Sequence, residues 1–236
     1  MTSISPKILM IVTSNDRLGE TERKTGYWAE ELAAPYRVFE AAGFTFDIAS
    51  PRGGTPPIDP MSLMDMYQTP VVQQFLQDPV VQARLEQTLR LDQVDGTLYD
   101  AIFVVGGFGV MWDLYSNTTL HSLIAHGIDA DLPVAAVCHA PSALAQVRFK
   151  NGDALVRGRR VTGFSNAEED AVALGVVMPT FVEDALRNAG SEYVKGENLF
   201  GSFIVRDGLL LTGQNPSSSE ALAHELVAAL RPTPTR

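Results

Sequence analysis

The fold of this chain is decided by one stretch of sequence, which reads Pro133-Val134-Ala135-Ala136-Val137-Cys138-His139-Ala140-Pro141. The apolar run 134–137 is typical of a strand buried on both faces, as in a parallel sheet covered by helices. Pro141 is typical of the first turn of a helix, because its fixed φ suits that position and its missing N–H has no partner to lose there. The stretch therefore predicts a buried strand that turns sharply into a helix.

The only cysteine of the chain, Cys138, occupies this turn. An elbow that exposes a nucleophile between strand and helix needs small residues two positions to either side, and Ala136 and Ala140 supply them. Because a helix N-terminus favours thiolate over thiol, we expect a lowered pKa for Cys138. The alternative is a small buried hydrophobe without chemistry, as free cysteines often are.

The rest of the chain alternates short apolar runs with longer helical patterns. Strands are expected at 8–12, 44–49, 101–105, 134–137 and 209–212, and helices at about 26–42, 71–93, 116–126, 141–147, 179–189 and 217–230. This alternation predicts an α/β fold, a doubly wound sandwich of flavodoxin-like type with a mostly parallel sheet flanked by helices. We expect residues 1–236 to form one domain, with an inserted helical segment at 61–93 and a frayed tail at 233–236.

Charge and composition exclude several classes of partner. The chain holds 18 Lys and Arg against 28 Asp and Glu, a net charge of −10, so it should repel nucleic acid and anionic membranes. No apolar run reaches the roughly 20 residues that span a bilayer, and the N-terminal one is too short for a signal peptide. A lone cysteine suits a reducing compartment. The chain is expected to be cytoplasmic, without nucleic-acid or membrane partners.

Two further segments carry groups with chemical potential. His139 follows the cysteine and is either its proton-transfer partner or a residue that caps a turn. The glycines of 106–109 either form a tight turn or let the backbone approach a substrate and donate N–H groups to an oxyanion. Neither a metal nor a nucleotide cofactor is expected, since there is no paired-histidine, CxxC or P-loop motif.

Two pairs of carboxylates are candidates for acid–base chemistry. Glu30 and Glu31 lie on the first predicted helix about 100° apart, so that one faces the sheet's crevice while the other faces elsewhere. A glutamate buried beside the cysteine would have a raised pKa and stay protonated. Glu168 and Glu169 are either part of a solvated face, or one of them orients His139.

Six motifs together point to a family. They lie at 24–36, 49–54, 106–114, 136–141, 161–166 and 211–216. With these motifs the chain, from Lys7 to Leu230, resembles the class I glutamine-amidotransferase-like superfamily that includes the DJ-1 and PfpI groups. The resemblance is greatest to its branch of heat-shock chaperone-like glyoxalase III proteins.

The resemblance implies a role for each candidate residue. It makes Cys138 the nucleophile, His139 its base, and Glu31 the glutamate that hydrogen-bonds the cysteine. The acid that pairs with the histidine falls on Glu169, with Glu168 as runner-up. Backbone N–H groups of Gly107 and His139 would form the oxyanion hole. Phe108 lies on the substrate-binding rim, where many relatives carry histidine, so the substrate itself is left open.

The activity implied by the resemblance is a glyoxalase III-type reaction, in which methylglyoxal and water give lactate without glutathione or any cofactor. A Cys138 hemithioacetal would split the reaction into easier steps. The partners implied are a small reactive aldehyde and a second copy of the chain in a homodimer. Two alternatives stay open: a cysteine peptidase or amidohydrolase, and a stress-response holdase or redox-sensing protein.

Overall fold

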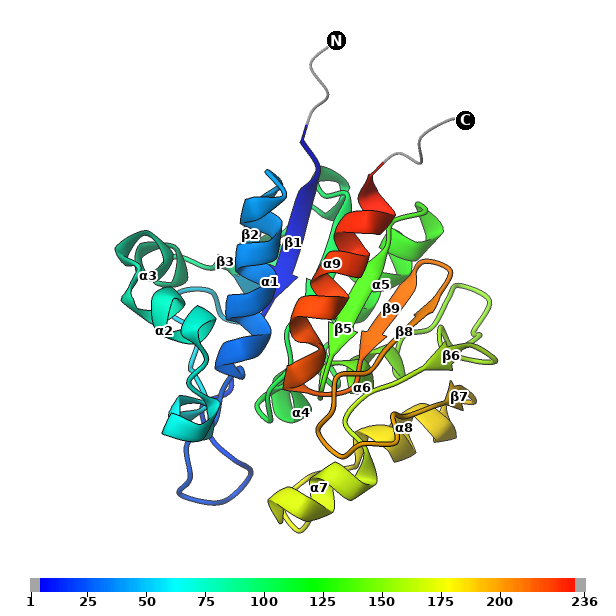
Figure 1. Cartoon of the computed structure of the whole chain (residues 1–236). Helices are drawn as coiled ribbons and strands as arrows, with labels where there is room; N and C mark the ends of the chain where they lie inside the picture. The colour runs from blue at the N-terminus through cyan, green and yellow to red at the C-terminus, as the bar shows by residue number, and fades with distance from the viewer. Residues whose placement is uncertain (1–4, 232–236) are drawn as a thin grey trace.

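The computed structural model describes residues 5–231 of the chain. Its central element is a seven-stranded sheet (Figure 1). Its strand order is β3-β2-β1-β4-β5-β9-β8, and all neighbouring pairs are parallel except β8 with β9. The prediction of a mostly parallel, flavodoxin-like sheet is confirmed. The strands are β1 (Lys7–Ile11), β2 (Thr45–Ser50), β3 (Leu89–Arg90), β4 (Ala101–Val104), β5 (Val134–Val137), β8 (Ile204–Asp207) and β9 (Leu210–Gly213).

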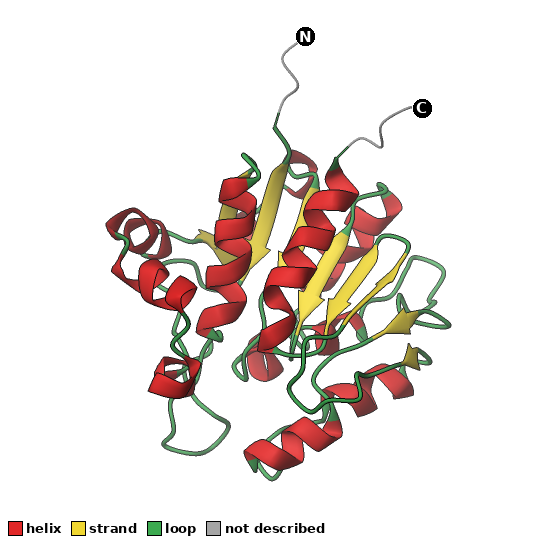
Figure 2. Cartoon of the chain, viewed as in Figure 1, coloured by secondary structure: helices red, strands yellow, loops and turns green. Residues whose placement is uncertain are grey.

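Helices cover both faces of this sheet (Figure 2). Helices α1 (Ala29–Ala41) and α9 (Ser219–Leu230) lie side by side on one face, and α5 (Thr118–Asp129) packs against β4 and β5 on the other. Every residue of β4 and β5 is therefore buried, which explains why these strands are apolar throughout. The remaining elements are α2 (Pro70–Gln77), α3 (Pro79–Leu85), α4 (Val110–Asp113), α6 (Pro141–Leu144), α7 (Asn166–Val172), α8 (Val182–Asn188), β6 (Arg160–Val161) and β7 (Glu192–Tyr193).

The segment between β2 and β4 differs from the single helix expected at 71–93. Helix α2 ends at Gln77 and α3 begins at Pro79. A proline has no N–H to continue a helix and keeps the residue before it out of the helical region, and Asp78 accordingly adopts an extended conformation. The Asp78 side chain then caps α3 by accepting the N–H groups of Val80 and Val81. Strand β3 follows and extends the sheet.

Six of the strands and helices named above were not expected from the sequence. Strands β3, β6 and β7 contain two residues each and α4 is a single turn, too few residues for a hydrophobic period to be recognised. Strand β8 and helix α7, of four and seven residues, were also missed. The tail expected at 233–236 lies outside the described residues. Between residues 5 and 231, none of the helices has the length and apolar character needed to cross a membrane.

The carboxyl ends of the central strands determine where chemistry is possible. Strand β1 pairs with β2 on one side and with β4 on the other. The connection to β2 therefore runs to one side of β1, and the later strands β4 and β5 are added on the opposite side. The crevice beyond the carboxyl ends at such a switch point is where open α/β sheets bind ligands. The loops that follow β1, β4, β5 and β9 meet there.

Candidate active site

Cys138 lies on the predicted elbow, immediately after β5. Its backbone has φ 62°, a left-handed conformation that costs a side chain about 1–3 kcal/mol. The cost is offset by hydrogen bonds on both sides, because its N–H donates to the carbonyl of Gly213 and its carbonyl accepts the N–H of Phe164. The side chain is only 2% exposed. The expectation of an ordinary buried cysteine therefore fits its burial but not its strained backbone.

His139 connects Cys138 to a carboxylate. Its Nδ1 lies 3.2 Å from the Sγ of Cys138, and its Nε2 lies 3.0 Å from Oε2 of Glu169, on α7. The imidazole and this carboxyl group are 1% and 2% exposed, so the contact is shielded from water. The structure thus brings three of the predicted residues into one chain of contacts, in the order sulfur, imidazole, carboxylate.

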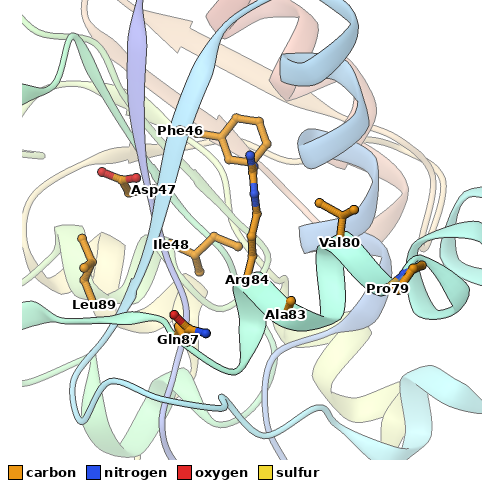
Figure 3. Close-up of a pocket in the computed structure, with 9 residues that line it drawn as sticks. All are labelled: Phe46, Asp47, Ile48, Pro79, Val80, Ala83, Arg84, Gln87 and Leu89. Carbon is orange, nitrogen blue, oxygen red and sulfur yellow. The ribbon is translucent and has the colours of Figure 1, made fainter.

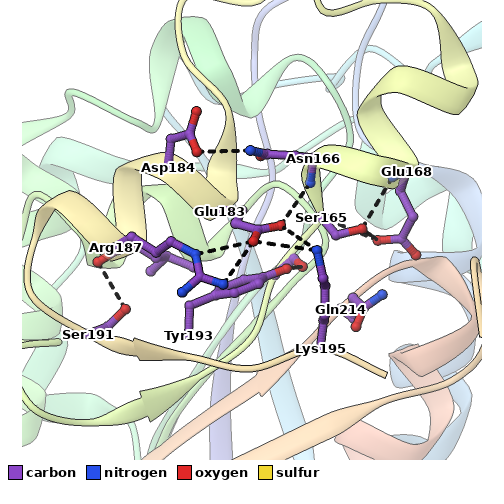
Figure 4. A network of polar contacts seen from close by, with 12 residues as sticks. Ser165, Asn166, Glu168, Glu183, Asp184, Arg187, Ser191, Tyr193, Lys195 and Gln214 are labelled. Atoms are coloured by element: carbon purple, nitrogen blue, oxygen red, sulfur yellow. Dashed lines mark hydrogen bonds and ion pairs between the residues drawn. The ribbon is translucent and has the colours of Figure 1, made fainter. Parts of the chain in front are cut away.

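Glu168, the alternative acid, makes different contacts. Its Oε2 accepts the N–H and the hydroxyl of Ser165, which begins α7 (Figure 4). Its Oε1 accepts hydrogen bonds from the backbone N–H of Phe200 and from Nδ2 of Asn215. All four contacts hold neighbouring backbone and loops in place, and none involves the imidazole. Adjacent positions on α7 therefore point into two different environments.

Glu31 and Glu30 also separate, as their helical positions predicted. Glu30 is partly exposed and accepts a hydrogen bond from Thr69. Glu31 is completely buried in the first turn of α1, and neither carboxyl oxygen has a hydrogen-bond partner among residues 5–231. Burial raises the pKa of Glu31 well above its ordinary value, although the nearby Cys138 thiol and the N–H of Gly106 oppose the shift. Burial therefore favours the protonated form of this carboxyl group.

Gly106 makes room for this carboxyl group. A β-carbon at position 106 would lie 2.4 Å from Oε2 of Glu31 and 3.0 Å from the β-carbon of Cys138. Real β-carbons do not approach other atoms so closely, so only glycine lets Glu31 and the cysteine meet at this point. Sequence reasoning treated Gly106 as part of a turn and missed this function.

The expectation of a lowered pKa at Cys138 is wrong. Burial raises the pKa of the Cys138 thiol well above its ordinary value, and the carboxylates of Glu168 and Glu169 act in the same direction. The helix that was expected to favour the thiolate, α6, is a single turn of four residues. It is too short to offset complete burial. The resting group is therefore a thiol, and its proton must be removed when the sulfur reacts.

The two backbone N–H groups expected to form an oxyanion hole belong to Gly107, after β4, and to His139, at the elbow. The backbone N–H groups of Gly107 and His139 have no hydrogen-bond partner within the described part of the chain. Gly107 has φ 107°, and a β-carbon there would lie 2.5 Å from the carbonyl oxygen of Gly26. The glycine is therefore required for the close packing of this turn.

A cavity of about 280 Å³ opens onto the sulfur. Five of its twelve lining residues are tryptophan, tyrosine or phenylalanine, and of these only Phe108 was identified from the sequence. Trp28 and Phe164 lie inside the family motifs, which is a signal that could have pointed to them. Tyr67 ends a short 3₁₀ helix (Asp65–Tyr67) and Phe200 lies in a loop, and both fall outside those motifs. The cavity is lined by Trp28, Met66, Tyr67, Gly107, Phe108, Cys138, His139, Phe164, Val172, Phe200, Pro216 and Ser217.

A larger cavity, of about 660 Å³, lies between β2 and α3 at the edge of the sheet (Figure 3). Arg84 extends along Phe46, with its guanidinium 5.4 Å from the ring centroid. Asp47 is paired with Lys7 at 2.7 Å. None of the nine lining residues is a cysteine, histidine or serine, so this cavity offers no nucleophile.

The chain is similar in sequence and in structure to several known proteins. The model of the DJ-1/PfpI family matches residues 24–229. Glyoxalase 3 of Candida albicans is 26% identical over 231 residues, which cover 94% of this chain and 98% of the relative. A probable glutathione-independent glyoxalase of Schizosaccharomyces pombe is 28% identical over 236 residues, covering 87% and 90%. The crystal structure of Rapid Encystment Protein 24 KDa from Francisella tularensis is 34% identical with a TM-score of 0.92, covering 96% and 100%.

Proposed function

This chain belongs to the DJ-1/PfpI family, and on that basis we propose that it is a glutathione-independent glyoxalase that converts methylglyoxal and water to lactate. The names of its relatives support this activity, since both curated relatives described above are glyoxalases. The observation that carries the proposal is the fully buried Glu31 carboxyl group, which has no hydrogen-bond partner among residues 5–231 and lies beside a cysteine–histidine pair. A proton donor at this place serves an isomerisation, which must move protons between neighbouring carbons.

The first step is addition of the sulfur to the aldehyde. His139 accepts the thiol proton at Nδ1 as the Sγ of Cys138 attacks the aldehyde carbon. This transfer is needed because the raised pKa of Cys138 keeps the resting group a thiol, which is a poor nucleophile. The Glu169 carboxylate at Nε2 stabilises the imidazolium that forms. Backbone N–H groups of Gly107 and His139 hold the developing oxyanion, which then takes up a proton to give a hemithioacetal.

The second step moves hydrogen between the two carbonyl carbons. His139 removes the proton from the carbon that is bonded to sulfur, and an enediolate forms. Glu31 gives its proton to the neighbouring carbon of this species, and the proton held by His139 then restores the Glu31 carboxyl group. The aldehyde carbon is thereby oxidised and the ketone carbon reduced within one molecule, so no external oxidant is needed. Water then cleaves the resulting thioester and releases lactate and the thiol.

Formation of lactate from methylglyoxal, without glutathione or added metal, tests the proposal. The wild-type chain should produce lactate, and Cys138→Ala should produce none above background. Glu30→Gln is the matched control, because this partly exposed carboxylate lies next to Glu31 but faces elsewhere. Equal lactate formation by Cys138→Ala would refute the proposal. Cys138-dependent cleavage of a peptide or amide, with no lactate formed, would establish a hydrolase instead.

Assembly and location complete the proposal. We take the protein to be a homodimer, as the resemblance implies. Light scattering that gives the mass of one chain would contradict the dimer. A cytoplasmic location is supported by the lone cysteine, which must stay reduced to react. Fluorescent tagging in cells tests it.

A further inference from the structure

The cavity above Cys138 is bounded by an almost continuous series of aromatic rings. The ring of Trp28 lies 5.0 Å from that of Tyr67 and 6.1 Å from that of Phe108. Phe164 continues the series on the other side of the imidazole, 6.2 Å from Phe200. Aromatic rings at these distances favour a planar apolar guest that stacks or packs edge-to-face.

Charge is absent from the wall of this cavity. Its twelve lining residues include no lysine, arginine, aspartate or glutamate. A substrate with a phosphate, carboxylate or ammonium substituent would leave that charge without a partner, at a large cost in desolvation. An apolar substituent pays no such desolvation cost when it enters the cavity.

The rim residue Phe108 adds to this apolar character. Its side chain is 3% exposed, and its ring lies 4.7 Å from the imidazole of His139. Its ring therefore presents a surface that an apolar group contacts favourably.

The outer wall, Phe200, is held in place by buried polar contacts. Its backbone has φ 59°, which a non-glycine residue adopts only where other contacts hold it. Oε1 of Glu168 accepts the Phe200 N–H at 3.1 Å, and Asn215 donates both to this oxygen and to the carbonyl of Gly201. The loop is thus fixed with the phenylalanine over the cavity, although its side chain is 39% exposed.

The cavity is also larger than methylglyoxal requires. Its volume of about 280 Å³ lies just below the roughly 300–1,000 Å³ of pockets that enclose drug-sized ligands. The substituent of methylglyoxal is a single methyl group, so it would leave most of the aromatic wall in contact with water. A phenyl ring or a branched alkyl group of similar size would cover it.

From these observations we infer that the preferred substrate is an α-oxoaldehyde with an aromatic or bulky apolar substituent, of which phenylglyoxal is the simplest probe. This inference rests on the proposed glyoxalase function and specifies its substrate class. The reaction is balanced as before: phenylglyoxal and water give mandelate, with the aldehyde carbon oxidised, the ketone carbon reduced and no other reactant consumed. Phe108 and Phe200 are the specificity-determining residues, and Glu168 is the positioning residue for Phe200.

Relative turnover of phenylglyoxal and methylglyoxal tests the inference. Each buried methylene multiplies affinity about fourfold, so kcat/KM should be roughly 10–100-fold higher for phenylglyoxal. Phe108→His and Phe200→Ala should each reduce this preference at least about fivefold, chiefly through the KM of phenylglyoxal. Leu98→Ala, at an exposed apolar position that does not line the cavity, should leave both substrates unchanged.

Binding of products by Cys138→Ala separates this inference from the proposed function. Calorimetric titration of this unreactive chain should show tighter binding of mandelate than of lactate, whether or not the wild-type chain has glyoxalase activity. Turnover of methylglyoxal with no preference for phenylglyoxal overturns the inference and leaves the proposed function intact. Absence of turnover, together with tighter mandelate binding, supports the apolar pocket and overturns the glyoxalase proposal. Equal binding of mandelate and lactate overturns the apolar pocket.

Discussion

The Nε2 of His139 lies 3.0 Å from Oε2 of Glu169, and both side chains are almost completely buried. A charged pair at this depth is shielded from screening by salt, so the carboxylate strongly stabilises an imidazolium formed during the reaction. Glu168, one residue earlier, makes four hydrogen bonds to other groups. Substitution of Glu169 should therefore affect mainly the reaction rate, whereas substitution of Glu168 should affect mainly the stability of the fold.

Glu169→Gln should lower kcat by roughly 10²-fold or more, because the amide can still contact His139 but carries no charge to stabilise the imidazolium. Glu168→Gln should lower kcat much less and instead reduce stability by about 1.5–3 kcal/mol, since it weakens charge-assisted hydrogen bonds. Steady-state kinetics and thermal unfolding of the same two preparations decide this. The assignment is wrong if Glu168→Gln is the slower enzyme.

Glu31→Gln should lower glyoxalase turnover by roughly 10²–10⁴-fold, the usual effect of losing a general acid or base. Glutamine has nearly the same volume and fits beside Gly106, so the fold and alkylation of Cys138 should persist. Glu30→Gln is the control and should change turnover little. Wild-type turnover by Glu31→Gln would mean that the proton is supplied by another group.

The same substitution should alter the pH dependence of stability. The unfolded chain releases the Glu31 proton near pH 4.3, whereas burial lets the folded protein keep it to higher pH. The stability contributed by this proton is therefore complete below about pH 4.3 and is lost as pH rises through the folded pKa.

Glu31→Gln has no proton to release at this position, so its stability does not fall with the deprotonation of residue 31. Its stability relative to wild type should rise with pH from about pH 4.3, by up to about 1.4 kcal/mol per unit, and should level off above the folded pKa. Urea unfolding at several pH values measures the difference. A constant difference between pH 4 and 8 would show that Glu31 is not protonated in the fold.

Alkylation of Cys138 by iodoacetamide should reach half its maximum rate above the value of about 8.5 found for free cysteine, because burial raises the pKa of this thiol. The chain has only one cysteine, so mass spectrometry follows a single site. An unfolded sample supplies the control and should titrate near the ordinary value. A midpoint below 8.5 in the folded protein would mean that a thiolate is the resting group.

The sequence alone was sufficient to predict the positions of the five main strands along the chain and the turn at Cys138. Residues 134–141 carry this information locally, because an apolar run, small residues around the turn and a proline restrict the backbone whatever lies nearby. The first helix is another example, since the spacing of Glu30 and Glu31 already separates their directions.

Only the tertiary structure decided which groups meet and what their surroundings do to them. The choice of Glu169 over Glu168 depends on how α7 docks beside the elbow, a contact between residues distant in sequence. Phe200 joins the cavity through a loop held by Glu168 and Asn215, which no local pattern encodes. The direction of the Cys138 pKa shift also reversed, because burial is a property of the packed molecule, whereas the sequence showed only the start of a helix that proved to be one turn long.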